Sequence, residues 1–135
     1  MTITRETDYA IRAIRALASD AGRIVKAADI AQQESIPVNF LFNILRKLKT
    51  AGIVDIRRGK YGGYQLLKSP SEITLRDMIE LFEDGVHLNL CTIDPSLCQN
   101  ARTCKVHEEF ERIERQLLEE LQRYSLAEIL TGETE

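Results

Sequence analysis

The chain has 135 residues, a formal net charge of −3 and an apolar fraction of 44%. A chain of this length forms one small domain with an appended element, and it contains no apolar run near the about 18 residues of a membrane-spanning helix. Because the amino terminus is polar from the start, we expect no secretory signal and a cytoplasmic protein without a membrane partner. Three cysteines, an odd number, argue against a disulfide framework.

Positive and negative charges are concentrated in different halves of the chain. Residues 1–70 contain 12 Lys or Arg and 6 Asp or Glu, whereas residues 71–135 contain 6 and 15. This asymmetry predicts that the first half meets a polyanion and that the second half has another role. We therefore divide the chain at residue 70.

Residues 1–52 have the apolar spacing of three helices. We expect a first helix over residues 4–21, a short second helix over 28–34, and a third that begins near Pro37 and ends before Gly52. The third has apolar residues at i, i+3, i+4 and i+7, namely Leu41, Ile44, Leu45 and Leu48. The tight turn before it predicts a helix-turn-helix. The solvent face of this third helix would carry Asn39, Asn43, Arg46 and Thr50.

Two short alternating segments, VDIR and YQLL, follow the third helix and are separated by the Gly-rich sequence GKYGG. This pattern predicts two strands joined in a hairpin. Between Arg46 and Lys68 lie seven Lys or Arg and one Asp, a local net charge of +6. A polar helix face followed by a basic hairpin predicts a winged helix-turn-helix that docks on double-stranded DNA, and we assign this role to residues 1–70. The basic side chains expected to face DNA include Arg46, Lys47, Arg57, Arg58 and Lys60.

The second half begins with a helix over residues 75–83, which Thr74 can cap, and continues with an irregular loop over 86–103. A last helix then runs from near Lys105 to about Tyr124. Its apolar residues follow a nearly heptad spacing, and its other face is almost entirely charged, with Glu111 and Glu114 among the exposed acids. We expect this helix to pair with its copy in a second subunit. The last five residues, TGETE, are expected to be disordered. The predicted fold is therefore mostly α, with a two-stranded wing and a long C-terminal dimerisation helix.

The loop and the start of the last helix contain every cysteine of the chain. Cys91, Cys98 and Cys104 have the spacing C-x6-C-x5-C, and His107 follows three residues later. Three thiolates and an imidazole complete the ligand set of a structural zinc or of an iron–sulfur cluster. Zinc sites usually use closer cysteine pairs, and wide gaps suit a loop around a larger inorganic core, but spacing alone leaves both open. A thiol-redox enzyme is a weaker alternative, because no C-x-x-C and no catalytic constellation are present.

From residue 1 to residue 130 the sequence resembles the iron–sulfur-cluster winged-helix transcriptional regulators of bacteria, the family of IscR and NsrR. The resemblance depends above all on Arg58-Gly59 followed by Gly62-Gly63-Tyr64, combined with the three cysteines. Further matches are Tyr9-Ala10, Asp29-Ile30-Ala31, Ala51-Gly52-Ile53-Val54, Ile73-Thr74-Leu75 and Ser125-Leu126.

The resemblance implies a homodimer that binds a pseudo-palindromic operator with an affinity switched by an iron–sulfur cluster. Asn39, Phe42 and Asn43 stand where the family's reading helix meets the major groove, and an Asn there can bond adenine. Phe42 replaces the polar residue of IscR, so the operator sequence does not transfer. Arg58 stands where the wing enters the minor groove. Gly62 and Gly63 would let the backbone approach phosphate closely.

Two residues compete as the fourth cluster ligand. His107 matches the position used in IscR-like members. Asp8 matches the position from which NsrR-like members reach the cluster of the partner subunit. We favour His107 and a 2Fe–2S cluster, because imidazole replaces thiolate in known two-iron sites, and a 4Fe–4S cluster stays open.

Overall fold

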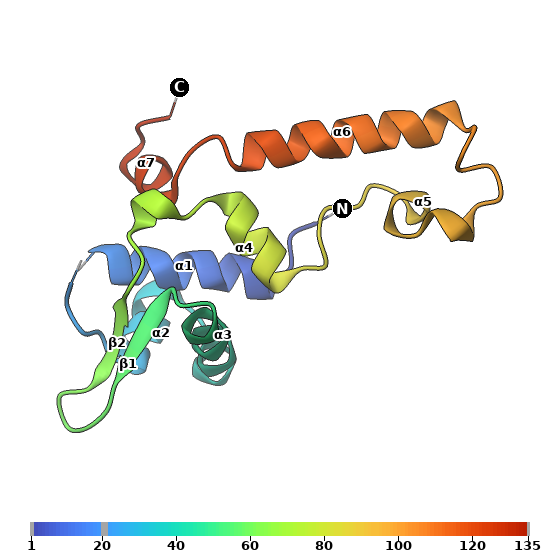
Figure 1. Cartoon of the computed structure of the whole chain (residues 1–135). Helices are drawn as coiled ribbons and strands as arrows, with labels where there is room; N and C mark the ends of the chain where they lie inside the picture. The colour runs from blue at the N-terminus through green and yellow to red at the C-terminus, as the bar shows by residue number, and fades with distance from the viewer. Residues whose placement is uncertain (1, 20–21, 135) are drawn as a thin grey trace.

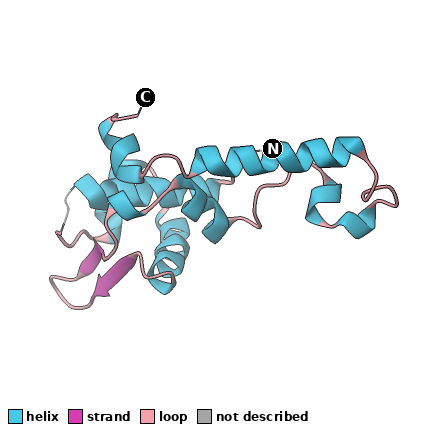
Figure 2. Ribbon diagram, turned by 45° about the horizontal axis from the view of Figure 1, so that its top comes forward, coloured by secondary structure: helices cyan, strands magenta, loops and turns pink. Residues whose placement is uncertain are grey.

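The computed structural model describes residues 2–19 and 22–134. It is mostly helical, with one two-stranded antiparallel sheet, as the sequence predicted (Figures 1 and 2). A body built mainly from the first half of the chain carries a long helix, one end of which lies beside the body while the rest extends well beyond it (Figure 1). No helix in the described part of the chain is long and apolar enough to cross a membrane.

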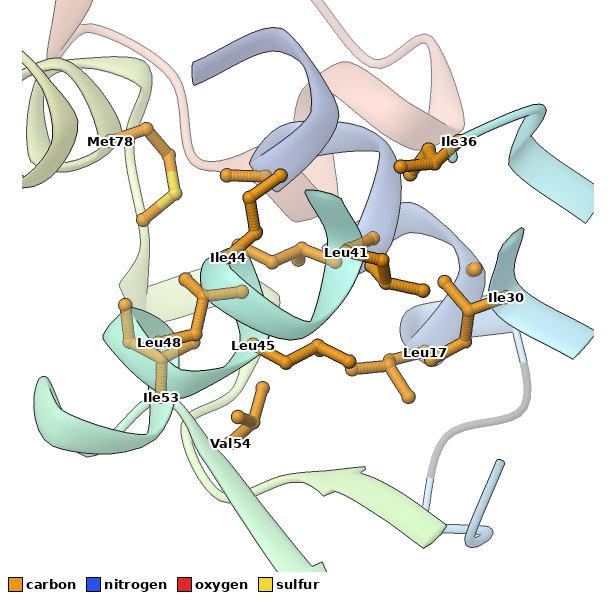
Figure 3. Packing of buried hydrophobic residues seen from close by; sticks show 14 of the residues in the cluster. Leu17, Ile30, Ile36, Leu41, Ile44, Leu45, Leu48, Ile53, Val54 and Met78 are labelled. Atoms are coloured by element: carbon orange, nitrogen blue, oxygen red, sulfur yellow. The ribbon is translucent and has the colours of Figure 1, made fainter. Parts of the chain in front are cut away.

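Four helices build the body: α1 (Arg5–Ser19), α2 (Ala27–Glu34), α3 (Val38–Thr50) and α4 (Leu75–Phe82). Residues 20 and 21, expected at the end of the first helix, lie outside the described residues. The predicted stripe of α3 is completely buried, and it packs against apolar residues of α1 and α2 (Figure 3). Gly52 has a φ of 77°, the left-handed conformation that suits the end of α3.

The predicted hairpin consists of β1 (Val54–Arg57) and β2 (Gly63–Leu66), which pair in the register Val54 to Leu66. A segment that the sequence did not reveal joins its other edge, because Val25 and Tyr64 exchange two backbone hydrogen bonds of 2.8 Å. The hairpin and its contact with Val25 leave no room for a side chain at either of the consecutive glycines Gly62 and Gly63. A Cβ at Gly62 would lie 2.0 Å from the Arg57 carbonyl oxygen, and one at Gly63 would lie 2.6 Å from the Val25 oxygen. The wing therefore requires both glycines whether or not DNA is bound.

Beyond α4 the chain forms an arm, which we define as residues 86–121. The arm contains the short helix α5 (Leu90–Ile93), a 3-10 turn at Pro95–Leu97 and the long helix α6 (Lys105–Leu121). The expectation of a wholly irregular loop over 86–103 was therefore wrong, because the side chains of Asn89 and Asp94 cap these two short turns. The last long helix also ends at Leu121, three residues before the predicted end.

After α6 the chain returns to the body as a further helix, α7 (Leu126–Thr131), which the sequence analysis missed. Ser125 and Glu128 form a capping box at its start, and the Leu126 N–H donates to the Ile73 carbonyl at 2.7 Å. Thr131 and Gly132 are part of this helix end, so the expectation of disorder was wrong for them. The body's hydrophobic core extends across residue 70, since Ile73, Met78 and Leu126 belong to it.

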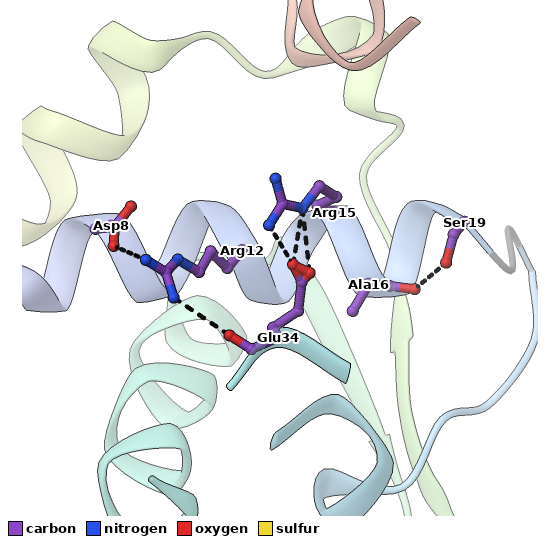
Figure 4. Close-up of polar contacts among 6 residues, drawn as sticks. All are labelled: Asp8, Arg12, Arg15, Ala16, Ser19 and Glu34. Atoms are coloured by element: carbon purple, nitrogen blue, oxygen red, sulfur yellow. Dashed lines mark hydrogen bonds and ion pairs between the residues drawn. The ribbon is translucent and has the colours of Figure 1, made fainter. Parts of the chain in front are cut away.

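Ion pairs join α1 to α2 on the surface of the body (Figure 4). The Arg15 Nε donates to both carboxylate oxygens of the largely buried Glu34, at 2.7 and 3.1 Å, which raises the pKa of Arg15. Arg12 donates to the Glu34 carbonyl and also pairs with Asp8 at 2.9 Å. These contacts hold α2 beside α1 and thereby set the position of α3.

Candidate nucleic-acid interface and candidate metal centre

The exposed face of α3 carries the side chains that the sequence predicted for base recognition. Asn39, Phe42 and Asn43 are all exposed, in the first half of the helix. Arg46 is also exposed, and its guanidinium donates to the Asn43 side-chain oxygen. That oxygen has a second lone pair, so Asn43 can still accept a bond from a base.

Lys47 differs from the other predicted phosphate contacts, because it is engaged within the body. Its ammonium pairs with Glu6 of α1 and lies 5.7 Å from the centroid of the Phe82 ring, at the end of α4. The charge of Lys47 is thus partly compensated, and its main visible role is to join α3 to α1 and α4.

The basic side chains of the wing are all exposed to solvent. Arg58 is exposed and pairs with no acidic side chain in the described part of the chain, so its charge is available to a partner. Arg57 lies 3.7 Å from the Asp55 carboxylate. At the tip, Lys60 lies 5.7 Å from the ring centroid of Tyr61, which is 83% exposed. The wing therefore offers three cations and an aromatic ring to solvent.

The arm brings the three cysteines and His107 together around one pocket of about 200 Å³. Cys91 lies in α5 and is buried, Cys98 follows the 3-10 turn, and Cys104 is the N-cap of α6. The remaining lining residues are Asn89, Leu90, Leu97 and Val106. We call this site the cysteine pocket.

His107 has the contacts expected of a metal-ligating histidine. Its side chain is buried, with Nε2 3.1 Å from the Glu111 carboxylate. Its Nδ1 is also buried and has no hydrogen-bond partner among the described residues. A carboxylate on one ring nitrogen fixes the tautomer and leaves the other nitrogen's lone pair for a ligand. The donors have not converged, however: among residues 2–19 and 22–134 no three His, Cys, Asp or Glu side chains are grouped closely enough to hold a metal ion.

Glu114 is the residue that sequence reasoning placed wrongly. We expected it on the charged outer face of α6, but it is buried and accepts two hydrogen bonds of 2.6 Å from residues that flank Cys91. The donors are the Leu88 N–H and the Thr92 hydroxyl. Glu114 thus fixes the Cys91 segment to α6. The heptad pattern gave no sign of this, because Glu114 is one of many acids on the helix.

Asp8, the alternative fourth ligand, lies on α1 in the body and does not line the cysteine pocket of its own chain. Its carboxylate pairs with Arg12 (Figure 4). A role in the partner subunit's site, which the resemblance suggested, would add a metal to a carboxylate that already pairs with Arg12.

Comparison with known proteins identifies the architecture. The Rrf2 family model, described as an iron-dependent transcriptional regulator, matches residues 3–132. The chain belongs to the Rrf2 family. A provisionally named HTH-type transcriptional regulator of Aquifex aeolicus is 35% identical over 111 residues, which cover 81% of this chain and 77% of the relative. Protein aau3 of Rhizobium meliloti is 29% identical over 131 residues, covering 96% and 85% of the two chains.

Solved structures agree with the Rrf2 assignment. CymR, the global cysteine regulator of B. subtilis, has a TM-score of 0.79 at 26% identity, and the match covers 100% of this chain and 99% of CymR. T. potens IscR has a TM-score of 0.73 at 22% identity, with coverage of 99% and 89%, a likeness that extends to the fold alone. The Rrf2 family consists of transcriptional regulators, so the chain is a winged-helix regulator.

Proposed function

We propose that this Rrf2-family chain is a DNA-binding regulator whose operator affinity is switched by an iron–sulfur cluster, held by Cys91, Cys98 and Cys104 with His107 as the fourth ligand. The observation that carries the proposal is the cysteine pocket, which is lined by all three cysteines and by His107, whose buried Nδ1 has no hydrogen-bond partner among the described residues. The family's description as iron-dependent supports the choice of iron.

The chemistry of the pocket suits such a cluster. Cys104 is the N-cap of α6, where free backbone N–H groups and the helix dipole stabilise a thiolate. The Glu111 contact would present His107 through Nδ1, as imidazole ligands with a carboxylate behind them are presented in other metal sites. A mixed thiolate and imidazole set favours the 2Fe–2S form. Asp8 of the partner subunit is the competing fourth ligand.

A bound cluster would supply a redox-active centre that ties the Cys91 and Cys98 loop to the start of α6. The opposite end of α6 contacts α4, because Arg76 of α4 donates to the side chain of Gln122, the C-cap of α6, at 2.8 Å. α4 in turn contacts α3, the proposed DNA-reading helix, because the Lys47 ammonium of α3 lies near the Phe82 ring of α4. A change in the cysteine pocket can therefore shift the reading helix by moving α6 against α4.

Dimerisation makes such a shift effective. Val106 and Ile113 of the predicted α6 seam are exposed, although both are apolar, which supports pairing of this helix with a second copy. Two reading helices would then meet half-sites of a pseudo-palindromic operator in cytoplasmic DNA. Because half-site spacing is fixed by the DNA helical repeat, a small change in their separation costs affinity.

The proposal is tested on protein purified without air. We expect visible absorption typical of an iron–sulfur cluster, with matching iron and sulfide, and their loss in Cys98→Ser but not in the nearby Ser96→Ala. Operator affinity should change when the cluster is removed. His107→Ala should alter the spectrum if His107 is the fourth ligand, whereas Asp8→Ala should do so if the partner's Asp8 is. Colourless protein with stoichiometric zinc would favour a structural zinc site and sink the sensing role.

A further inference from the structure

Two apolar side chains stand exposed on the reading face of α3. Val38 is 42% exposed and Phe42 is 47% exposed, and their spacing of four residues sets them one above the other on the helix. Phe40 of the same helix is 41% exposed, but its ring lies edge-on to Tyr9 of α1, with centroids 5.4 Å apart. Phe42 contacts no other ring within the described residues. Val38 and Phe42 therefore leave apolar surface uncovered on the face of α3 that also carries Asn39 and Asn43.

We infer that Val38 and Phe42 recognise the C5 methyl groups of thymine in the major groove. The methyl group is the one apolar feature on the major-groove edge of a base pair, and apolar side chains are its usual partners. Asn39 and Asn43 lie directly beside Val38 and Phe42 on α3, and their amides match the N6 and N7 of adenine. Val38 and Phe42 thus suit the thymine of an A·T pair, and Asn39 and Asn43 suit its adenine. This inference rests on the DNA-binding part of the proposed function.

The charges around Val38 and Phe42, which we call the apolar strip, favour DNA over a protein as the partner of this surface. Arg46 and Lys49 are exposed farther along the same helix, and Arg58 and Lys60 are exposed on the wing. No acidic residue occurs in α3 itself. The apolar strip is thus bordered by cations, as expected for a surface that meets phosphates on either side of a groove. The first two turns of a reading helix are also the part that reaches base edges.

The experiment uses full-length protein, purified without air and assayed with and without its metal. Binding sites are first selected from a library of random DNA duplexes. Single thymines of the selected site are then replaced by deoxyuridine, which removes only the methyl group. At the contacted thymines we expect a loss of about fourfold in affinity, the effect of one buried methyl group.

Variants make this test specific. Phe42→Ala should bind the thymine and uracil duplexes at a contacted position equally well. Arg58→Ala, which acts at the minor groove, should weaken both to the same extent and keep their ratio. Equal affinity of the wild-type protein for thymine and uracil at every position would overturn the inference and leave the proposed function intact. Failure to select any preferred duplex, with or without metal, would overturn both.

Discussion

The body and the arm of this molecule are stabilised by different means. The body has a continuous core of buried apolar side chains from α1, α2, α3, β1, α4 and α7. None of the arm residues 86–121 belongs to that core. The arm instead has a few buried apolar side chains of its own, Val86, Cys91 and Ala101, together with the two hydrogen bonds of Glu114 and its short turns. The core packing holds α3 and the wing in place without a ligand. The cysteine pocket lies outside that core, so its local stability should be lower, as is usual for segments that respond to a ligand.

The largest contrast should appear in stability. Leu45→Ala removes a completely buried side chain from α3 and should lower the free energy of unfolding by about 2–5 kcal/mol. Ile93→Ala removes an exposed apolar side chain from α5 and should change it by less than about 0.5 kcal/mol. Urea denaturation of both variants at one protein concentration measures the difference. Equal losses would mean that the arm is packed as firmly as the body.

Arg58→Ala separates the two regions by function. Loss of this exposed guanidinium from the wing should weaken DNA binding by about 1–3 kcal/mol and reduce its salt dependence, while metal content stays unchanged. Fluorescence anisotropy at several salt concentrations, together with metal analysis, provides both readouts. Unchanged affinity would contradict the assignment of the wing.

Glu114→Ala tests how the arm is held. The Leu88 N–H and the Thr92 hydroxyl lose a buried acceptor, which should lower the free energy of local opening by about 1–3 kcal/mol. Glu114→Gln retains an acceptor oxygen and should lose less. Hydrogen exchange at the Leu88 amide in metal-free protein measures the opening. Wild-type exchange in Glu114→Ala would show that other contacts hold the segment.

The smallest effect concerns the pair between Glu6 and Lys47. Glu6→Gln breaks a partly exposed ion pair, so the free energy of unfolding should change by less than about 1 kcal/mol. If the released Lys47 then meets a phosphate, the salt dependence of DNA binding should steepen by about one ion. An unchanged slope would assign Lys47 to the body alone and remove it from the DNA surface.

Periodicity and turn chemistry were enough to predict the helix-turn-helix and the wing. The stripe of Leu41, Ile44, Leu45 and Leu48, the Gly52 stop and the two strands of the hairpin all follow from local patterns. The pairing of Val25 with Tyr64 could not be predicted in this way, because the two residues are distant in sequence and a single backbone bridge leaves no alternation to detect. α7 did have a local signal, the capping box formed by Ser125 and Glu128, which is visible in the sequence.

The arm was less predictable than the body for a physical reason. The four ligands proposed for the metal are readable as residue types, and the structure gathers them around one pocket. The residues that hold this pocket in place, Glu111 and Glu114, do not stand out in the sequence, because α6 contains many acidic residues. Only the three-dimensional path of the 88–92 segment distinguishes Glu114, which is buried, from Glu109, which is exposed and pairs with Arg112.

Because the chain comes back to the body at Leu126, the arm is an excursion with both ends attached to the body, which acts as its scaffold. The arm begins after α4. It ends before Leu126, whose N–H donates to the carbonyl of Ile73, just before α4. Since the scaffold closes its interior without help from the excursion, the excursion is free to differ in length and sequence while the winged-helix body stays the same. Such a design lets one DNA-binding body carry different arms.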